Sequence, residues 1–285
     1  MPDVHAFLGP SGAHRWMNCT AAPHYETQFP GGDTLYTREG TLAHSVCEIT
    51  ARYKFTGTVT KRAYNAGLKK IQNDPAWDAV IKDPKETRTK DDIWAEMLQT
   101  ADAYCEHISD VRLRFENPPY MNLEVGVSLK HIIPEGFGTC DCVLIGDGLL
   151  HIIDYKHGSG HAVSADHNPQ MMLYALGALE RYKLLYGDSI KLVEMSICQP
   201  RIAATPDEYK LSVEELKAWG NWLKPIAEEA FKGPGSFHPG EWCLFCRGKY
   251  KCQARADAAL CAAEYMDLVL PDTAETPRVP PIMTN

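Results

Sequence analysis

Three short apolar runs follow one another in the middle of the chain and constrain its fold more than any other feature. They are YMNLEVGVSL at 120–129, GTCDCVLIG at 138–146 and LLHIIDYK at 149–156. All three are rich in β-branched residues and bounded by turn residues, which is typical of β-strands. The GDG sequence at 146–148 predicts a tight hairpin between the second and third runs. We therefore expect three adjacent strands.

Before these runs, apolar residues recur at helical spacing. A short helix is predicted from Ser11 to about Cys19, and a stripe through 42–49 predicts a second helix with His44 off its apolar face. From 91 to 115 apolar residues recur every three or four positions, so we expect a long amphipathic helix there. Residues 56–90 are rich in Lys, Asp and Pro and favour no element.

After the three runs the helical period returns. The pattern predicts a helix over 169–186, a strand within 189–201, and a helix from the capping box at Ser212 to about Phe231. Helices mixed with a strand meander predict an α/β core, and residues 56–117 are expected to add a helical lobe to it. The Pro-rich stretch at 266–285 is expected to be a disordered tail.

Composition limits the class of protein. The 285 residues are 45% hydrophobic, enough for one sizeable core, and we expect a single domain over 1–265. The N-terminal sequence lacks a signal-peptide pattern, and the sequence contains no apolar window of membrane-spanning length, so we expect a cytoplasmic protein. A formal net charge of −8 argues against a generally basic nucleic-acid-binding surface. Ten cysteines in such a chain favour metal or redox use over disulfides.

The strand IIDYK contains the most reactive pair of side chains. On a strand, Asp154 and Lys156 point to the same side while Tyr155 points to the other. A hairpin turning at Asp147 brings Asp141 close to Asp154. Two such carboxylates can bind Mg²⁺ or Mn²⁺, and a lysine beside them can orient an attacking water. Asp-x-Lys alone is also a common surface ion pair, so this pattern needs further support.

Three further side chains provide it. Gln170 and Tyr174 lie four residues apart, hence on one helix face, where they can bind a phosphate or position Lys156. His44, in EGTLAH, offers a nitrogen ligand from an early helix. Singly, these residues have ordinary explanations: Tyr174 as a core residue, Gln170 as a surface amide and His44 as a hydrogen-bonded helix histidine.

The order His, Asp, Asp-x-Lys, Gln-x-x-x-Tyr resembles the RecB-like branch of the PD-(D/E)XK nuclease superfamily over roughly residues 5–255. The resemblance implies a restriction-endonuclease-like α/β core, a mixed sheet flanked by helices. The residues it assigns to metal binding are His44, Asp141, Asp154 and the carbonyl of Tyr155. Those it assigns to catalysis are Lys156, which serves the attacking water, Gln170 and Tyr174. Glu124 occupies the place of a supporting acid in some relatives, or is simply exposed.

The cysteines form a second pattern. Cys243, Cys246 and Cys252 follow the spacing C-x₂-C-x₅-C, and Cys19 is the obvious candidate for a fourth ligand. Four thiolates suit either an iron–sulfur cluster or Zn²⁺. The pattern resembles the iron–sulfur nucleases of the same branch, such as Cas4 and AddB nuclease domains. This resemblance implies a [4Fe–4S] cluster joining the two ends of the domain, with Thr20 in place of the usual Pro.

Four basic residues lie in and beside the cysteine segment: Arg247, Lys249, Lys251 and Arg255. They are candidates for DNA-phosphate contacts, although a solvated loop explains them nearly as well. The resemblance implies a metal-dependent DNA exonuclease acting on single strands or duplex ends in recombination, repair or phage replication, working beside a single-strand annealing protein. The alternatives are an endonuclease or nickase of the same fold, or a non-catalytic Cys₄ DNA-binding or assembly protein.

Overall fold

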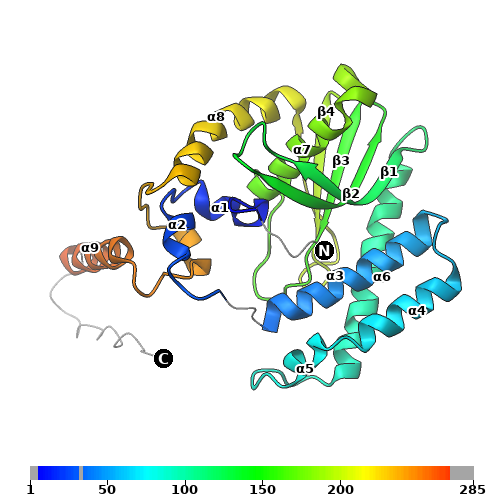
Figure 1. Cartoon of the computed structure of the whole chain (residues 1–285), viewed down its shortest axis with the longest axis horizontal. Coiled ribbons are helices and arrows are strands. Elements are labelled where there is room, and N and C mark those ends of the chain that lie inside the picture. Colours follow the sequence, from blue (N-terminus) through cyan, green and yellow to red (C-terminus); the bar gives the residue numbers. More distant parts are fainter. Residues whose placement is uncertain (1–5, 32–34, 270–285) are drawn as a thin grey trace.

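A five-stranded mixed sheet lies at the centre of the computed structural model, which describes residues 6–31 and 35–269 (Figure 1). Its spatial order is the sequence order: β1 (Tyr120–Ser128), β2 (Phe137–Gly146), β3 (Leu149–Tyr155), β4 (Leu192–Cys198) and β5 (Asp207–Ser212). Neighbours are antiparallel except β3 and β4, which run parallel and are joined through α7 (Pro169–Tyr186). The three expected adjacent strands and the α/β class are confirmed.

The hairpin between β2 and β3 turns where the sequence predicts. Asp147 and Gly148 both have positive φ, +47° and +74°, the combination that a two-residue type I′ hairpin turn requires. The Asp147 carboxylate also accepts a hydrogen bond of 2.7 Å from the backbone N–H of Glu116, which fixes the turn to the segment just before β1.

Helices flank the sheet and connect its strands. Their bounds are α1 (Ala13–Trp16), α2 (Ala22–Glu26), α3 (Leu35–Phe55), α4 (Lys61–Gln72), α5 (Ala76–Ile81), α6 (Lys90–Leu113), α7, α8 (Val213–Lys232) and α9 (Gln253–Val269), with short 3₁₀ turns at Pro10–Gly12, Gly187–Ser189 and Glu241–Phe245. None of these described helices is long and apolar enough to cross a membrane.

Several helix ends are set by side-chain caps. Thr89 forms a capping box with Asp92 at the start of α6, and Ser212 forms the predicted one with Glu215 at the start of α8. Asn168 accepts hydrogen bonds from the backbone N–H groups of Gln170 and Met171 and so begins α7. The helices expected over 91–115, 169–186 and 212–231 are confirmed.

Helices α4, α5 and α9 and strand β5 were not expected as individual elements. Helices α4 and α5 form within residues 56–90, a stretch rich in Lys, Asp and Pro, and no residue of α4 is buried. Strand β5 is a mostly exposed edge strand with the polar sequence DEYKLS. Helix α9 follows the cysteine segment and includes the first residues of the predicted 266–285 tail, whose remainder at 270–285 lies outside the described residues.

The sheet buries both of its faces, which gives three layers. One face packs against α7 and α8 in an apolar cluster that includes Leu150 and Ile152 of β3. The opposite face packs against α3, α5 and α6 in a second cluster that includes Ile153 and Tyr155. Alternate side chains of β3 therefore enter different layers. The proposed division into a nuclease domain with a lobe at 56–117 stays a prediction, although α6 covers one face of the sheet directly.

The two ends of the described chain meet beside this core. Thr20 donates a hydrogen bond of 2.7 Å to Glu229 of α8 and accepts one of 2.8 Å from the backbone of Ser236. Trp242 packs against a small buried cluster around Cys19. Figure 1 shows α1 and α2 beside the segment that leads into α9. The N-terminal residues are thus held against the segment that carries the other cysteines.

Close contact between α7 and β1 gives a first prediction. A Cβ atom added at Gly177 would lie 2.8 Å from Cβ of Val127, which cannot move without its strand. We expect Gly177→Ala to lower the free energy of unfolding by about 1–3 kcal/mol, despite the better helix propensity of alanine. The measurement is chemical denaturation. Gly40→Ala in α3 is the matched control, since its Cβ meets nothing within 4 Å and should stabilise by about 0.5–1 kcal/mol.

Candidate active site

His44 and Asp141 come together from α3 and β2. Nδ1 of His44 lies 3.7 Å from Oδ2 of Asp141, and the same oxygen accepts a hydrogen bond of 2.8 Å from the backbone N–H of Tyr155. Burial raises the pKa of Asp141 to about 6; His44 opposes this shift and the negative charge of Asp154 adds to it. The hairpin therefore places the two carboxylates near enough to repel each other.

Asp154 and Lys156 share one side of the end of β3. Nζ of Lys156 lies 2.9 Å from Oδ2 of Asp154 and donates a hydrogen bond of 3.0 Å to Oε1 of Gln170. The amide of Gln170 in turn donates a hydrogen bond of 3.1 Å to the hydroxyl of Tyr174. The four residues thus form one polar chain from the sheet into the first turns of α7.

Tyr155 points to the opposite side, as the alternation predicts. Its ring is fully buried, and its hydroxyl bonds to Thr100 of α6 at 2.7 Å and to Nδ1 of His157 at 2.8 Å. The strand end is therefore held from the α6 side while Asp154 and Lys156 face the other way. The carbonyl of Tyr155 stays a predicted metal ligand.

All the predicted catalytic and metal-binding side chains apart from Tyr155 open onto one cleft of about 580 Å³. The cleft is lined by His44, Asp141, Asp154, Lys156, Gln170 and Tyr174, together with Glu124, Arg15, Glu26 and Arg247. Elements far apart in the sequence thus contribute to a single concave surface, the usual form of a ligand site.

The donor atoms of this cleft fit a divalent cation. Oδ2 of Asp154 is buried and accepts no hydrogen bond from the described residues, although the Lys156 ammonium is near. Asp141 supplies a second carboxylate and His44 an imidazole nitrogen. Carboxylate oxygens are the ligands that Mg²⁺ prefers, and Mn²⁺ accepts imidazole as well.

Glu124 lies beside the predicted ligands. The pairing of Leu123 with Cys142 and of Val125 with Cys140 puts Glu124 opposite Asp141 in the register of β1 and β2. Its φ is +51°, which is unusual for a residue other than glycine within a strand. Burial raises its pKa to about 8, and Asp141 adds to this shift. Glu124 therefore belongs to the cleft and does not point freely into solvent.

The four predicted cysteine ligands line one cavity. Cys19, Cys243, Cys246 and Cys252 surround it from both ends of the domain, and each is a free thiol. Burial raises the pKa of the Cys19 thiol, and the nearby Cys243 and Cys252 add to this effect. The backbone N–H of Gly240 points to Sγ of Cys243 at 3.5 Å. An all-thiolate set of this kind fits an iron–sulfur cluster or zinc.

The four basic residues of the cysteine segment lie at different places, and their contact with DNA stays a prediction. Arg247 lines the cleft. Lys249 and Arg255 line the cysteine cavity and donate to backbone carbonyls of their own segment, at 2.7 and 2.9 Å. Lys251 is exposed. Arg15, which the sequence did not single out, lines both cavities and donates to Glu26 at 2.9 Å.

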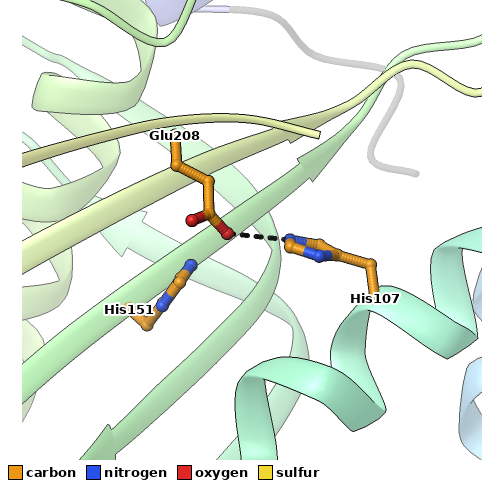
Figure 2. Close-up of side chains that lie close together, drawn as sticks. All are labelled: His107, His151 and Glu208. Carbon is orange, nitrogen blue, oxygen red and sulfur yellow. Dashed lines mark ion pairs between the residues drawn. The ribbon is translucent and has the colours of Figure 1, made fainter. Parts of the chain in front are cut away.

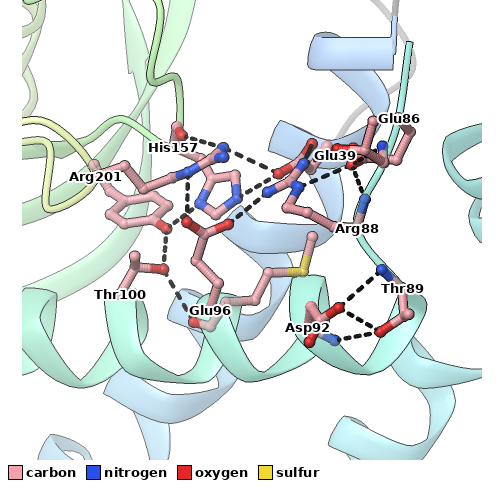
Figure 3. Close-up of polar contacts among 12 residues, drawn as sticks. Glu39, Glu86, Arg88, Thr89, Asp92, Glu96, Thr100, His157 and Arg201 are labelled. Atoms are coloured by element: carbon pink, nitrogen blue, oxygen red, sulfur yellow. Dashed lines mark hydrogen bonds and ion pairs between the residues drawn. The ribbon is translucent and has the colours of Figure 1, made fainter.

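A charged network next to the site was also missed. Glu39 of α3 accepts hydrogen bonds from Arg88 at 2.9 Å and Arg201 at 3.0 Å, and it contacts Nε2 of His157 at 3.1 Å (Figure 3). These bonds hold the pKa of Glu39 below its usual range even though burial opposes this. Its members are distant in the sequence and follow no motif, so only the fold brings them together.

The fold and the site together define a three-layer α/β protein whose central strands bring two aspartates and a lysine into one cleft with a histidine from α3. A family model described as "Protein of unknown function (DUF2800)" matches residues 5–283, and the chain belongs to this family.

Two solved structures show distant similarity. One, described as "Crystal structure of SSO0001", is 13% identical over 75% of this chain and 85% of that chain, with a TM-score of 0.31. Another, "Crystal Structure of LHK-Exo in complex with dAMP", is 10% identical over 79% of this chain and 93% of that chain, with a TM-score of 0.29. Both TM-scores are low.

Because Asp141 and Asp154 lie close enough to repel each other, we predict that a divalent metal ion stabilises the protein. In EDTA, Asp141→Asn should melt at the same temperature as the wild type or higher, because asparagine still accepts the Tyr155 N–H without repelling Asp154. Saturating Mg²⁺ or Mn²⁺ should stabilise the wild type, by about 2.7 kcal/mol at a hundredfold excess over the dissociation constant, and the variant far less. Thermal denaturation measures both. Asp188→Asn, at an exposed site, is the control, and metal should raise its melting temperature as much as that of the wild type. A wild-type melting temperature that does not change with Mg²⁺ or Mn²⁺ would contradict the prediction.

Proposed function

We propose that the protein is a metal-dependent DNA exonuclease of the PD-(D/E)XK type. The observation that carries this proposal is the position of Lys156, whose ammonium lies between Asp154 and Gln170 at the floor of the cleft that Asp141 and His44 also line. A lysine beside two carboxylates suits the hydrolysis of a phosphodiester, because the reaction needs both a bound cation and an oriented water.

Each residue of the cleft has a separate task in this proposal. Asp141, Asp154 and His44 would hold Mg²⁺ or Mn²⁺, which when bound lowers the pKa of a water and polarises the phosphate. Lys156 orients the water and offsets the charge of the phosphate, and Gln170 keeps the ammonium in place by accepting its hydrogen bond. Tyr174 accepts from Gln170, so its own proton is available to a phosphate oxygen.

Positive charge at the wall of the cleft supports a nucleic-acid substrate. Arg15 and Arg247 line it, and both are bound to Glu26: Arg15 through its side chain, Arg247 through its backbone N–H at 2.8 Å. Since the Arg247 side chain is not used in that bond, its guanidinium is available to a phosphate group. Single strands or duplex ends are the proposed form of the substrate. A single-strand annealing protein remains the proposed partner.

The nuclease assay tests the site directly. The wild type should degrade DNA with Mg²⁺ or Mn²⁺ and lose this activity in EDTA. Asp154→Ala and Lys156→Ala should each lower the rate by about 100-fold or more, because one removes a metal ligand and the other the group that orients the water. Lys183→Ala, on the exposed side of α7, is the matched control and should keep full activity.

The form of the DNA separates the candidate activities. Linear DNA that is degraded while a circle stays intact indicates an exonuclease, whereas cleavage of the circle indicates the endonuclease or nickase alternative. Full activity in both Asp154→Ala and Lys156→Ala would refute the site. DNA binding without any hydrolysis would support the non-catalytic Cys₄ alternative.

We further propose that Cys19, Cys243, Cys246 and Cys252 hold a [4Fe–4S] cluster, with Zn²⁺ as the alternative occupant. The supporting observation is that the four thiols line one cavity, although Cys19 comes from the opposite end of the chain. A group bound there would close a very long loop and so restrict the unfolded chain, by the same entropic reasoning that applies to a long-range disulfide.

Colour and iron content test this second site. Protein purified without oxygen should be brown, absorb broadly near about 400 nm and contain iron in preference to zinc. Cys19→Ala should lose the cluster and up to about 4–5 kcal/mol of stability. Cys261→Ala, at an exposed cysteine, is the control and should lose neither. A colourless zinc protein would identify the alternative, and a Cys19→Ala protein that keeps its cluster would refute the ligand.

A further inference from the structure

Two histidines and a glutamate meet on the α6 side of the sheet (Figure 2). His107 comes from α6, His151 from β3 and Glu208 from β5, and Figure 2 shows their side chains pointing toward one another. One ligand atom from each lies within 4.8 Å of the other two, and Nε2 of His107 is 4.0 Å from Oε1 of Glu208. Because side chains alternate along β3, this cluster faces the layer opposite to Asp154 and is separate from the cleft.

Each of the two imidazoles has one buried ring nitrogen without a hydrogen-bond partner among the described residues. The side chains of His107 and His151 are 4% and 0% exposed. Nε2 of His107 and Nδ1 of His151 are buried without a hydrogen bond from any described residue. Buried polar atoms are nearly always paired, so two unpaired nitrogens in one cluster indicate a missing partner.

The protonation state of the histidines suits a ligand role. Burial lowers the pKa of His107, and it lowers the pKa of His151 to about 3, with the neighbouring His107, Arg114 and Lys210 adding to the shift in His151. Both rings are therefore neutral near pH 7 and present a lone pair.

We propose that His107, His151 and Glu208 bind a divalent transition-metal ion of the zinc type, which fastens α6 to β3 and β5. Two imidazoles and one carboxylate are a common zinc ligand set, and they leave a fourth position for water. An oxygen-preferring ion such as Mg²⁺ is a poorer match because two of the three donors are nitrogen.

The geometry needs little adjustment. Tetrahedral zinc with bonds of about 2.0–2.1 Å holds its ligand atoms about 3.4 Å apart, so each side chain has to move by an ångström or less. Each ring nitrogen of His151 has a polar neighbour: Nε2 contacts Oγ of Ser196, and Nδ1 lies 3.9 Å from Glu194. Whichever nitrogen binds the metal, the other one therefore has a polar group beside it. Such neighbours fix the proton of a metal-bound imidazole.

The charged surroundings are balanced. Arg114 holds both oxygens of Glu208, at 2.9 and 3.0 Å, and Lys210 lies 3.8 Å from Glu194. Each carboxylate oxygen has two lone pairs, so Glu208 can bind Arg114 and an ion at once. Asp110 also acts on His107 from its own helix. The positive charge of an ion is therefore added to a site that already contains compensating acids.

Zinc content tests this proposal. The full chain is purified without oxygen, so that the cysteine site is treated alike in every sample, and is dialysed against micromolar Zn²⁺ in excess Mg²⁺ before elemental analysis. The variants are His107→Gln and Glu208→Gln, which each remove one ligand. Arg114→Gln is the matched control, because it breaks the same ion pair with Glu208 and leaves the carboxylate.

Wild type and Arg114→Gln should each hold about one zinc ion more per chain than His107→Gln and Glu208→Gln. Loss of a hydrogen bond that supports a metal ligand typically weakens metal binding by about 10–100-fold, and loss of the ligand itself should weaken it at least as much. Zinc should also raise the melting temperature of the first pair more than that of the second. If His107→Gln fails to fold, the zinc content of Glu208→Gln alone tests the proposal, because the Glu208 side chain is partly exposed and its replacement should leave the fold intact. Two results would overturn the proposal. One is an equal zinc content in all four proteins, which is expected if the cluster binds only a buried water. The other is a loss of zinc in Arg114→Gln equal to the loss in Glu208→Gln.

Discussion

The buried carboxylate of Glu39 fixes the relative positions of the elements that form the cleft. A buried charge is tolerated only when it is fully paired, and Glu39 satisfies this through Arg88, His157 and Arg201. His157 follows β3 directly, and Glu39 lies on the helix that carries His44. The pairing therefore joins the helix with the predicted nitrogen ligand to the strand with Asp154 and Lys156. Removing Arg88 or Arg201 would leave the buried Glu39 carboxylate with one cation fewer, so the partners are held in fixed positions.

Alternation along β3 explains how one strand serves a core and a site at the same time. Its apolar residues enter both layers, and its last residues divide in the same way: Tyr155 bonds to Thr100 in the α6 layer, while Asp154 and Lys156 face the cleft. Burial, with a smaller contribution from the neighbouring carboxylates, raises the pKa of Asp141 and of Glu124, so the cleft disfavours their ionised forms. Rigidity on one side of the strand thus holds carboxylates together that would otherwise separate.

Sequence patterns predicted the parts of the fold that depend on interactions between residues close together in the chain. The hairpin at Asp147 follows from its turn residues, and the side-by-side placement of Asp154 and Lys156 follows from the strand period. Helix α4 and strand β5 escaped prediction because their sequences are rich in polar residues and bury few apolar side chains. The Glu39 network and the His107 cluster could not be predicted for a different reason: their members lie tens of residues apart, and only tertiary packing selects which polar residues meet.

The ends of the chain complete the cleft, which gives the cysteine site a consequence for the active site. Glu26, one helix beyond Cys19, accepts from the side chain of Arg15 and from the backbone of Arg247, next to Cys246. The two arginines at the wall of the cleft are therefore positioned by the same junction that gathers the thiols. A group bound by those thiols would hold this junction closed and keep Arg15 and Arg247 at the cleft, whereas its loss would release a wall of the cleft and leave the aspartates and lysine of the sheet in place.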